Sequence, residues 1–223
     1  MIIDHKPLPE KIAEFIRNQI IQGKLKSGEK ILEAQIAEDL NISRTPVREA
    51  IRLLECEGFV ELLPRRGAIV KEFSEKDFKD IVEIKACLSS LTAELSFEKI
   101  NENIIGKLKS IIENEKKILA NNSFTNEKIY KFFKECSKFQ ETFLKLCDNT
   151  HLVDLNLKIE NHIKRYRFYF LKFPEILKKI PELQENVVNA IIEKNIFKLK
   201  EAYSDYIKIP YFSLIKNLKN EKN

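Results

Sequence analysis

The residues best suited to chemistry lie in a short segment that contains Ser43, Arg44, Thr45 and Arg48. Arginine presents a rigid fork of N–H donors that matches the acceptor edge of guanine or a phosphate, and hydroxyls bond to either group. The apolar residues among them recur at helical spacing: Val47, Ala50, Ile51 and Leu54. The pattern therefore predicts a helix that buries one face and presents arginines near its N-terminus, as suits a DNA major groove.

A second set of polar residues lies within apolar stripes of helices predicted after residue 75. Gln140, Gln184 and Tyr206 each fall on an apolar helical face, and Lys85 and Ser89 run beside one that includes Ile81, Leu88 and Leu95. Burying an unpaired amide or hydroxyl costs about 1–3 kcal/mol. Either these groups satisfy one another as a core network, or they line a wet cavity that holds a ligand. The spacing alone leaves both interpretations open.

Local signals position the arginine-bearing helix. Ser43 is a good N-cap and Pro46 is tolerated only in a first turn, so the helix begins at about Arg44. Gly58 ends it in the manner of a left-handed C-cap glycine. The turn Asn41-Ile42 separates it from a shorter helix, which is helix-turn-helix spacing. The shorter helix has the apolar positions Leu32, Ile36, Ala37 and Leu40.

A β-hairpin is predicted after Gly58. Two short apolar runs, 59–63 and 68–70, are joined by Pro64-Arg65-Arg66-Gly67. The two arginines at the tip suit phosphates or a minor groove, and Gly67 allows the backbone to come close to them. An N-terminal helix with an apolar face is expected to pack beneath this unit, through Ile12, Phe15, Ile16 and Ile20.

These motifs resemble the GntR family of bacterial transcription regulators. The resemblance covers residues 10–71 and implies a winged helix-turn-helix in a homodimer that binds a short inverted repeat of double-stranded DNA. We expect a repressor whose DNA-binding residues are Ser43, Arg44, Thr45, Arg48, Arg65, Arg66 and Gly67. The matching segments are Gly23-Lys24-Leu25-Lys26-Ser27-Gly28-Glu29, Ser43-Arg44-Thr45-Pro46-Val47-Arg48-Glu49-Ala50, Glu57-Gly58 and Pro64-Arg65-Arg66-Gly67.

Composition sets further bounds. The 223 residues suffice for two small domains, and the formal net charge is +5. Residues 1–72 are nevertheless neutral, with twelve Lys and Arg against twelve Asp and Glu. The same stretch holds six of the eight arginines: Arg17, Arg44, Arg48, Arg52, Arg65 and Arg66. The prediction of DNA binding therefore rests on where the arginines lie and not on bulk charge.

Other function classes find little support in the sequence. No apolar run approaches the ~20 residues of a membrane span, and the N-terminus lacks a secretory core, so we expect a cytoplasmic protein with no membrane partner. There is no Gly-rich phosphate loop, GxSxG motif or paired-histidine motif, so we expect no enzymatic activity. The cysteines show no CxxC spacing and are expected to be reduced and mostly packed: Cys56, Cys87, Cys136 and Cys147.

The remainder of the chain is predicted to be an all-α bundle, which makes the whole fold mainly α. The boundary between the domains, 1–72 and 73–223, falls where Ser74-x-x-Asp77 resembles a capping box. Pro210 is expected to end or kink the last helix, and the tail after Asn217 is expected to fray. Helices are predicted at about 75–97, 102–121, 126–147, 151–172, 181–194 and 196–209.

This second half resembles the FadR-type C-terminal (FCD) effector domain. The segment Phe139-Gln140-Glu141-x-x-Leu144-x-x-x-x-Asp148-Asn149-Thr150-x-Leu152 carries the resemblance over roughly residues 75–210, and Ala190-Ile191 and Tyr206 fit its last helices. The resemblance implies that the domain binds a small organic acid and relays its occupancy to the DNA-binding heads. Many members of this class hold a metal with one Asp and three His.

The sequence departs from that metal pattern at all four positions. The Asp position is Cys136, and the His positions are Gln140, Gln184 and Tyr206. Amides and phenols are poor ligands for zinc or nickel compared with imidazole, so we expect no metal and no cofactor. A rescue site from Cys136 and His162 is the alternative.

The expected effector is a small carboxylate. An Arg followed four residues later by a Glu is usual in this class, and here the pair reads Lys85 and Ser89. Arg165 or Arg167 could add a second cation, and Arg165 is the one predicted. The candidate effector-binding residues are Lys85, Ser89, Cys136, Gln140, Arg165, Gln184 and Tyr206. The alternative is a ligand-silent domain that serves only for dimerisation.

Overall fold

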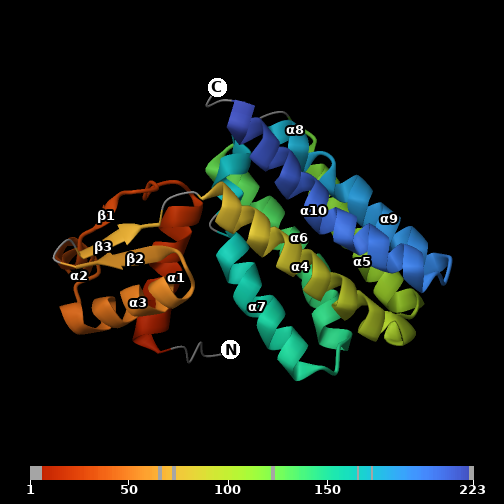
Figure 1. Cartoon of the computed structure of the whole chain (residues 1–223), viewed down its shortest axis with the longest axis horizontal. Helices are drawn as coiled ribbons and strands as arrows, with labels where there is room; N and C mark the ends of the chain where they lie inside the picture. Colours follow the sequence, from red (N-terminus) through yellow and green to blue (C-terminus); the bar gives the residue numbers. More distant parts are fainter. Residues whose placement is uncertain are drawn as a thin grey trace. The chain divides into compact units, whose positions relative to one another are not determined.

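The chain folds into two compact units, Met1–Ser74 and Glu75–Asn223, each with its own core (Figure 1). The division falls two residues beyond the predicted boundary at 72/73. The predicted mainly α fold, with a winged helix-turn-helix followed by a helical bundle, is confirmed. The structure is a computed structural model that describes residues 7–64, 67–71, 74–121, 124–164, 166–171 and 173–220.

The first unit combines helices with a small sheet. The strands are antiparallel in the order β1-β3-β2, and the predicted hairpin is confirmed, with Val60 opposite Val70 and Leu63 opposite Gly67. The sequence pattern does not reveal β1, because two residues are too few to show alternation. In chain order the elements are α1 (Leu8–Ile21), β1 (Lys30–Ile31), α2 (Glu33–Asp39), α3 (Arg44–Cys56), β2 (Val60–Leu63) and β3 (Gly67–Val70).

The core of the first unit joins α1 to α3. Phe15 was expected in it, but this prediction is wrong: Phe15 is 41 % exposed, and Ala13 is buried on the inner face of α1 instead. Leu32 is also exposed, because it lies at the extended N-cap position of α2 and not on its buried face. The buried residues of the two helices are Ile12, Ala13, Ile16, Ile20, Val47, Ala50, Ile51 and Leu54.

Both ends of α3 agree with the sequence signals. The helix begins at Arg44 with Ser43 as the N-cap residue, although the Ser43 side chain makes no capping hydrogen bond to the described residues. At the other end Gly58 adopts φ +75°. The amides of Gly58 and Phe59 donate to the carbonyls of Glu55 and Leu54, which is the Schellman arrangement. A left-handed glycine thus turns the chain from α3 into β2.

The regular secondary structure among the described residues of the second unit is entirely helical. The predicted helix at 151–172 is wrong in extent, because α7 ends at Lys164 and a 3-10 turn, η2, follows at Arg167–Leu171. The sequence pattern also does not reveal the short helix α8. The elements are α4 (Glu75–Ser96), η1 (Phe97–Lys99), α5 (Glu102–Leu119), α6 (Asn126–Leu146), α7 (Thr150–Lys164), η2, α8 (Pro174–Leu177), α9 (Ile180–Ile192) and α10 (Ile196–Asn220).

The last helix runs through Pro210 instead of ending there. α10 continues to Asn220, so the prediction of a helix that stops near 209 with a frayed tail from Asn217 is wrong for residues 210–220. A proline inside a helix costs about 3 kcal/mol. Apolar burial beyond it offsets that cost, because Leu214, Ile215 and Leu218 are buried. The helix packs along α4 and α9 (Figure 1).

Aromatic and aliphatic side chains fill the core of the second unit. The predicted apolar face of α6, on which Gln140 lies, is confirmed, with Phe132, Cys136, Phe139 and Phe143 buried. On α4 the expectation that Leu95 lies on an inward apolar face is wrong, because its side chain is 45 % exposed. The ring centroids of Phe143 and Tyr203 lie 4.8 Å apart, nearly perpendicular, as aromatic pairs prefer.

The cysteines are unevenly buried. All four are free thiols, and Cys136 and Cys147 are buried, whereas Cys56 and Cys87 are exposed. The prediction that most of them are packed is therefore wrong for two of the four. In the described part of the chain, every helix is too short or too polar to cross a membrane.

Candidate functional site

The outer face of α3 carries the predicted contact residues of the first unit. Arg44, Thr45 and Arg48 are exposed, and Ser43 is exposed just before the helix. The opposite face is buried in the core, through Val47 and the residues that follow it at helical spacing. The helix is thus fixed by its apolar side and leaves two guanidinium groups exposed, where they can meet another molecule.

Glu33 orients one of these arginines. The Nε of Arg48 donates to Oε2 of Glu33 at 2.7 Å. This bond joins the second turn of α3 to the first residue of α2. The Arg48 side chain is still 64 % exposed, so its terminal amino groups remain available. This partner is missing from the sequence prediction, because no spacing rule links residues fifteen positions apart on different helices.

Arg17 has a different role from the other arginines of the first unit. It makes two hydrogen bonds to Glu57, from Nε at 2.8 Å and from Nη2 at 2.7 Å, and its guanidinium lies 5.8 Å from the ring centre of Phe59. The bidentate pair joins α1 to the residue that follows α3. Arg17 therefore stabilises the fold of the unit, which its position in the sequence does not reveal.

The wing is described on both sides of its tip. Gly67 has φ +82°, a conformation that L residues with a side chain rarely adopt, so glycine is required there for the backbone. An added Cβ would lie 3.7 Å from Cε of Lys30, so space alone does not exclude one. Arg65 and Arg66, which are predicted to contact DNA, lie outside the described residues.

The predicted effector residues meet inside the second unit. Lys85, Cys136, Gln184 and Tyr206 are buried, as is Ser89. Gln140 is half-buried, and its amide donates to the hydroxyl of Tyr206 at 3.5 Å. Arg165 lies outside the described residues. The structure divides the remaining residues into two groups.

The first group is cationic. The ammonium of Lys85, 2 % exposed, lies 3.3 Å from Oε2 of Glu160 and 3.4 Å from Oδ1 of Asn156. Ser89 also donates to Asn156, at 3.4 Å. Burial lowers the pKa of Lys85, and the charge of Glu160 only partly opposes this. Glu160 and Asn156 share the buried face of α7 with Leu152 and Ile163, a helical spacing that could have revealed them.

Arg167 is the second cation of this group. It is 6 % exposed, pairs with the other oxygen of Glu160, and lies 4.7 Å from the ring centre of Phe133. Tyr211 lies close enough to Arg167 to interact with its charge. Burial opposes ionisation of Glu160, but the charges of Arg167 and Lys85 outweigh this effect and hold its pKa below the usual value. Two buried cations thus face one carboxylate.

The second group surrounds Glu115, a fully buried residue of α5. Nε2 of Gln184 donates to Oε1 of Glu115 at 3.0 Å and to the hydroxyl of Tyr206 at 3.3 Å. The Cys136 thiol lies close enough to interact with Glu115, and burial, with the charge of Glu115, raises the pKa of Cys136 well above its usual value. Desolvation raises the pKa of Glu115 to about 8. The four positions at which the resembled class holds a metal therefore converge near a carboxyl group that the sequence prediction does not include.

Some buried polar atoms of this interior have no hydrogen-bond partner among the described residues. They are Nε of Arg167, Oε1 of Gln184 and the second carboxyl oxygens of Glu115 and Glu135. Unpaired buried polar groups are uncommon and often mark a bound water, ion or ligand. No group of three or more His, Cys, Asp or Glu that could hold a metal occurs within the described residues.

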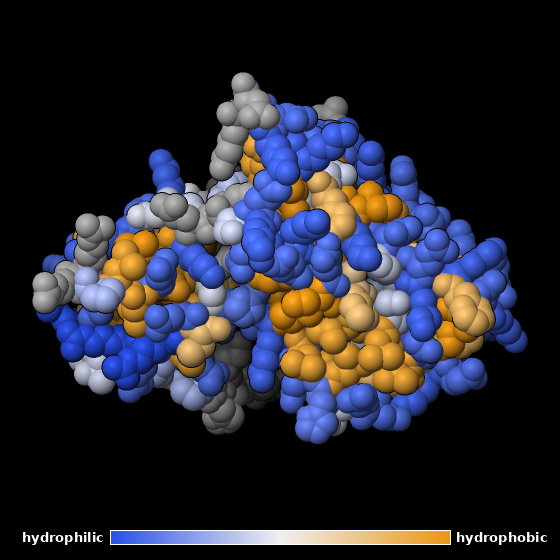
Figure 2. Space-filling view, in the orientation of Figure 1, coloured by the Kyte–Doolittle hydropathy of each residue, from blue (hydrophilic) through white to orange (hydrophobic). Residues whose placement is uncertain are grey.

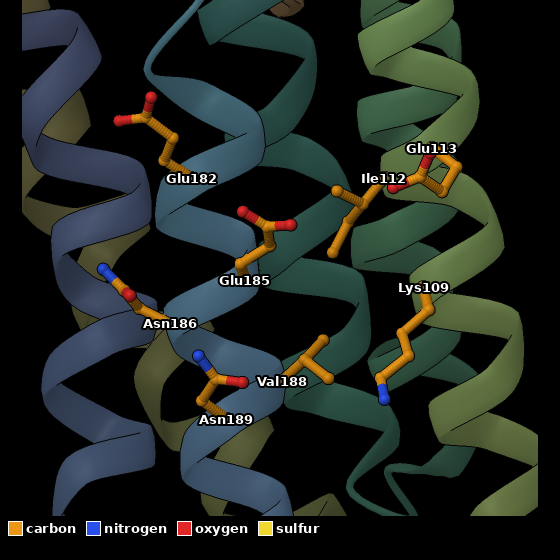
Figure 3. Close-up of a pocket in the computed structure, with 8 residues that line it drawn as sticks. All are labelled: Lys109, Ile112, Glu113, Glu182, Glu185, Asn186, Val188 and Asn189. Atoms are coloured by element: carbon orange, nitrogen blue, oxygen red, sulfur yellow. The ribbon is translucent and has the colours of Figure 1, made fainter.

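A groove on the surface lies apart from these residues. It has a volume of about 590 Å³ and lies between α5 and α9, with Lys109 and Glu113 on one side and Glu182 and Glu185 on the other (Figure 3). Glu185 pairs with Lys116 at 2.6 Å. None of the predicted site residues lines this groove. Its lining residues are Lys109, Ile112, Glu113, Glu182, Glu185, Asn186, Val188 and Asn189.

Known proteins similar to this chain are regulators. The family model described as "Bacterial regulatory proteins, gntR family" matches residues 8–70. The uncharacterized HTH-type transcriptional regulator YdhC of Bacillus subtilis is 31 % identical over 152 residues, 67 % of this chain and 66 % of that protein. The gluconate operon transcriptional repressor of the same species is 28 % identical over 142 residues, 64 % of this chain and 56 % of that protein. The chain thus spans less than two thirds of these curated relatives.

A solved structure shares the fold of the whole chain. The structure titled "E. coli McbR/YncC" has a TM-score of 0.78 at 18 % identity and is covered over 99 % of its length by 96 % of this chain. The winged arrangement, the exposed arginines of α3 and the family match all concern the same segment. Residues 8–70 of this chain are a helix-turn-helix domain of the GntR family of bacterial regulatory proteins.

Proposed function

We propose that the chain is a cytoplasmic transcription regulator, and a repressor, that binds an inverted-repeat operator in double-stranded DNA. The observation that carries this proposal is the outer face of α3, where Arg44, Thr45 and Arg48 are exposed above a buried apolar face. Repression is proposed instead of activation because one relative is the gluconate operon transcriptional repressor.

Each DNA-facing residue has an expected role. Arg44 and Arg48 contact base edges in the major groove, and Ser43 and Thr45 contact phosphates. Arg65 and Arg66, with Gly67, bind phosphate or the minor groove from the wing. The Glu33 carboxylate engages Nε of Arg48 and leaves the two terminal amino groups to approach guanine end-on.

Footprinting upstream of this gene and its neighbours identifies the operator, and binding assays then test the recognition helix. Arg48→Ala should weaken operator binding by about 1–3 kcal/mol and relax specificity at one base pair. Lys109→Ala, which removes an exposed cation from the helical unit, is the control and should leave binding unchanged. An equal loss on operator and random DNA would contradict the base-reading role.

We infer that the protein is a homodimer before it meets DNA. Two DNA-binding domains related by a two-fold axis would match the two halves of an inverted repeat. Support comes from an exposed apolar stripe at helical spacing on α4, with Leu155 of α7 also exposed. Figure 2 shows hydrophobic side chains gathered over these two helices. A second copy would cover such a patch. The stripe comprises the exposed Ile84, Leu91 and Leu95 and the half-buried Leu88.

Sedimentation at micromolar concentration tests the dimer. Leu91→Glu should shift the protein toward monomer, because it puts a charge into the apolar stripe. Phe197→Glu, at an apolar residue of α10 that is 82 % exposed, is the matched control and should not change the mass. A monomeric wild-type chain would contradict the proposal.

We also propose that the interior of the helical unit binds a small carboxylate that modulates DNA affinity. The supporting observation is that two buried basic side chains, Lys85 and Arg167, share a single carboxylate, Glu160. An anionic ligand would complete this set with charge-assisted hydrogen bonds. The residues proposed to face the ligand are Lys85, Ser89, Cys136, Gln140, Arg165, Gln184 and Tyr206, to which Arg167 is added.

The second candidate is a helical unit that binds no ligand and serves only for dimerisation. The hydrogen bonds that join Lys85, Asn156 and Ser89 favour it, because they satisfy polar groups within the fold. Thermal shift against a panel of organic acids separates the two candidates. A stabilising acid that also releases the operator supports the effector role, and silence across the panel supports the dimerisation role.

Transition metals are not expected at the four positions where related effector domains hold one. Amides, a phenol and a thiol stand there, and these groups supply less affinity than imidazole and carboxylate together. Elemental analysis of protein purified without chelators or a His-tag tests this prediction. About one zinc or nickel per chain, retained on dialysis and lost in Gln140→Ala, would contradict it.

A further inference from the structure

The carboxylate of Glu33 lies beside Arg48 at the surface of the first unit. We propose that Glu33 reads a base itself. Its carboxylate accepts a hydrogen bond from the amino group of a cytosine, in the base pair next to the guanine that Arg48 contacts. This inference rests on the proposed function as a DNA-binding regulator, and it adds a specificity-determining residue outside the recognition helix.

The contact between Glu33 and Arg48 uses only one atom of each charged group. Nε of Arg48 donates to Oε2 of Glu33. Oε1 of Glu33 and both terminal nitrogens of Arg48 have no hydrogen-bond partner among the residues that the structure describes. The Glu33 side chain is 30 % exposed, and that of Arg48 is more exposed. A second molecule can therefore reach the pair and bond to both of its members.

The position of this carboxylate distinguishes Arg48 from its neighbours. Of Arg44, Arg48 and Arg52 on α3, only Arg48 has a carboxylate partner within the described part of the chain. An exposed ion pair adds little to the stability of a fold. The main effect of Glu33 is therefore on what this part of the surface can bind.

A carboxylate that faces DNA needs a hydrogen-bond donor, because the phosphates repel its charge. The donors that base edges offer in the major groove are the amino groups of cytosine and adenine. The adenine amino group lies beside the acceptor N7, which would repel the free oxygen of Glu33, whereas the cytosine amino group lies beside a C–H. Since an ionised carboxylate only accepts hydrogen bonds, Glu33 favours cytosine and rejects guanine and thymine.

The spacing of the two charged groups is close to one base step. Successive base pairs lie about 3.4 Å apart along the duplex. Because Glu33 occupies Nε of Arg48, the terminal nitrogens are the ones that meet guanine, and the carboxylate lies at one side of the guanidinium, 2.7 Å from Nε. The free oxygen of Glu33 therefore reaches the neighbouring base pair, so that the two side chains together read two adjacent positions.

Binding of the full-length chain to the footprinted operator, and to each single-base-pair variant of it, tests the inference. Replacing the cytosine beside the Arg48 position should weaken wild-type binding by about five- to tenfold. Glu33→Ala should abolish this cytosine preference and reduce the guanine preference by a few-fold at most. Glu38→Ala, which removes an exposed carboxylate from the same helix, is the matched control and should keep both preferences.

A base analogue isolates the proposed hydrogen bond. Pyrimidin-2-one keeps the cytosine ring but lacks its amino group, and it replaces the cytosine in an otherwise unchanged operator. The replacement should weaken wild-type binding about fivefold more than it weakens binding of Glu33→Ala, because only the wild-type chain loses a hydrogen bond. Glu33→Gln retains an acceptor oxygen, so its binding should remain sensitive to the analogue.

The outcomes separate this inference from the proposal beneath it. If Glu33→Ala relaxes only the guanine position, or no position, the inference is overturned while DNA binding stands. An equal effect of the base analogue on the wild-type chain and on Glu33→Ala also overturns it. If the wild-type chain binds no DNA sequence specifically, the proposed function fails and the inference with it.

Discussion

Both units of this protein pair arginine or lysine with a glutamate, but they do so in opposite surroundings. In the first unit Arg48 bonds to Glu33 at the surface, and its side chain remains 64 % exposed. In the second unit Lys85 and Arg167 hold Glu160 in the interior. Water screens the first pair and leaves its arginine free for another partner. The second set has lost its water, so each member depends on the others.

The largest expected effect distinguishes these two kinds of pair by stability. Glu160→Gln should destabilise the helical unit by about 3–5 kcal/mol, because it leaves Arg167, which cannot lose its proton, buried without a counter-charge. Glu33→Gln, the matched change at the surface, should alter stability by about 0–1 kcal/mol. Urea unfolding with a constant m-value measures both. Similar losses of stability in the two variants would show that the interior pair contributes no more to folding than the surface pair.

The pH dependence of stability tests the interior further. Glu115 has a pKa of about 8 in the folded chain, whereas an unfolded Glu titrates near ~4.3. Between these values the folded chain holds a proton that the unfolded chain has lost. Stability should therefore fall as pH rises through this window, by up to about 1.4 kcal/mol per pH unit.

Glu115→Gln should remove this slope between about pH 5 and pH 8, because glutamine does not titrate. Glu113→Gln, an exposed residue of the same helix, is the control and should retain the slope. Urea unfolding at each pH provides the measurement. An unchanged slope in Glu115→Gln would mean that the buried carboxyl is not the source.

A smaller effect is expected from the wing. Replacing Arg65 or Arg66 with alanine removes one phosphate or minor-groove contact, so the slope of log K against log salt should decrease by about 1. Titration of labelled operator at several salt concentrations measures it. Lys107→Ala, an exposed cation on α5, should leave the slope unchanged. An unchanged slope in the wing variants would exclude them from the DNA contact.

The smallest effect concerns Glu33 as the partner of Arg48. Glu33→Gln keeps an acceptor for Nε but loses the charge, so Arg48 should be less well oriented. The ratio of operator to single-mismatch affinity should decrease by a few-fold, about 1 kcal/mol or less. Competition binding with the two duplexes measures the ratio. A uniform change on both duplexes would indicate only altered attraction to phosphate.

Local sequence signals determined much of the first unit. The cap at Ser43, the first-turn Pro46 and the left-handed Gly58 depend on neighbouring residues, so α3 could be predicted to the residue at its start. The apolar periodicity of α3 likewise predicted which face lies outward. Such signals are short in range, and for this reason they can be read without the fold.

Tertiary structure decided the pairs that join distant segments. Glu115 on α5 meets Gln184 on α9, and Glu160 on α7 meets Lys85 on α4; no local spacing links either pair. The same holds for Pro210, where packing of the residues beyond it lets the helix continue. A side chain's partner and its loss of water depend on how whole helices pack. The sequence therefore determined the apolar faces of most helices, and only the packed helices decided which polar residues are buried with them and which of these share a charge.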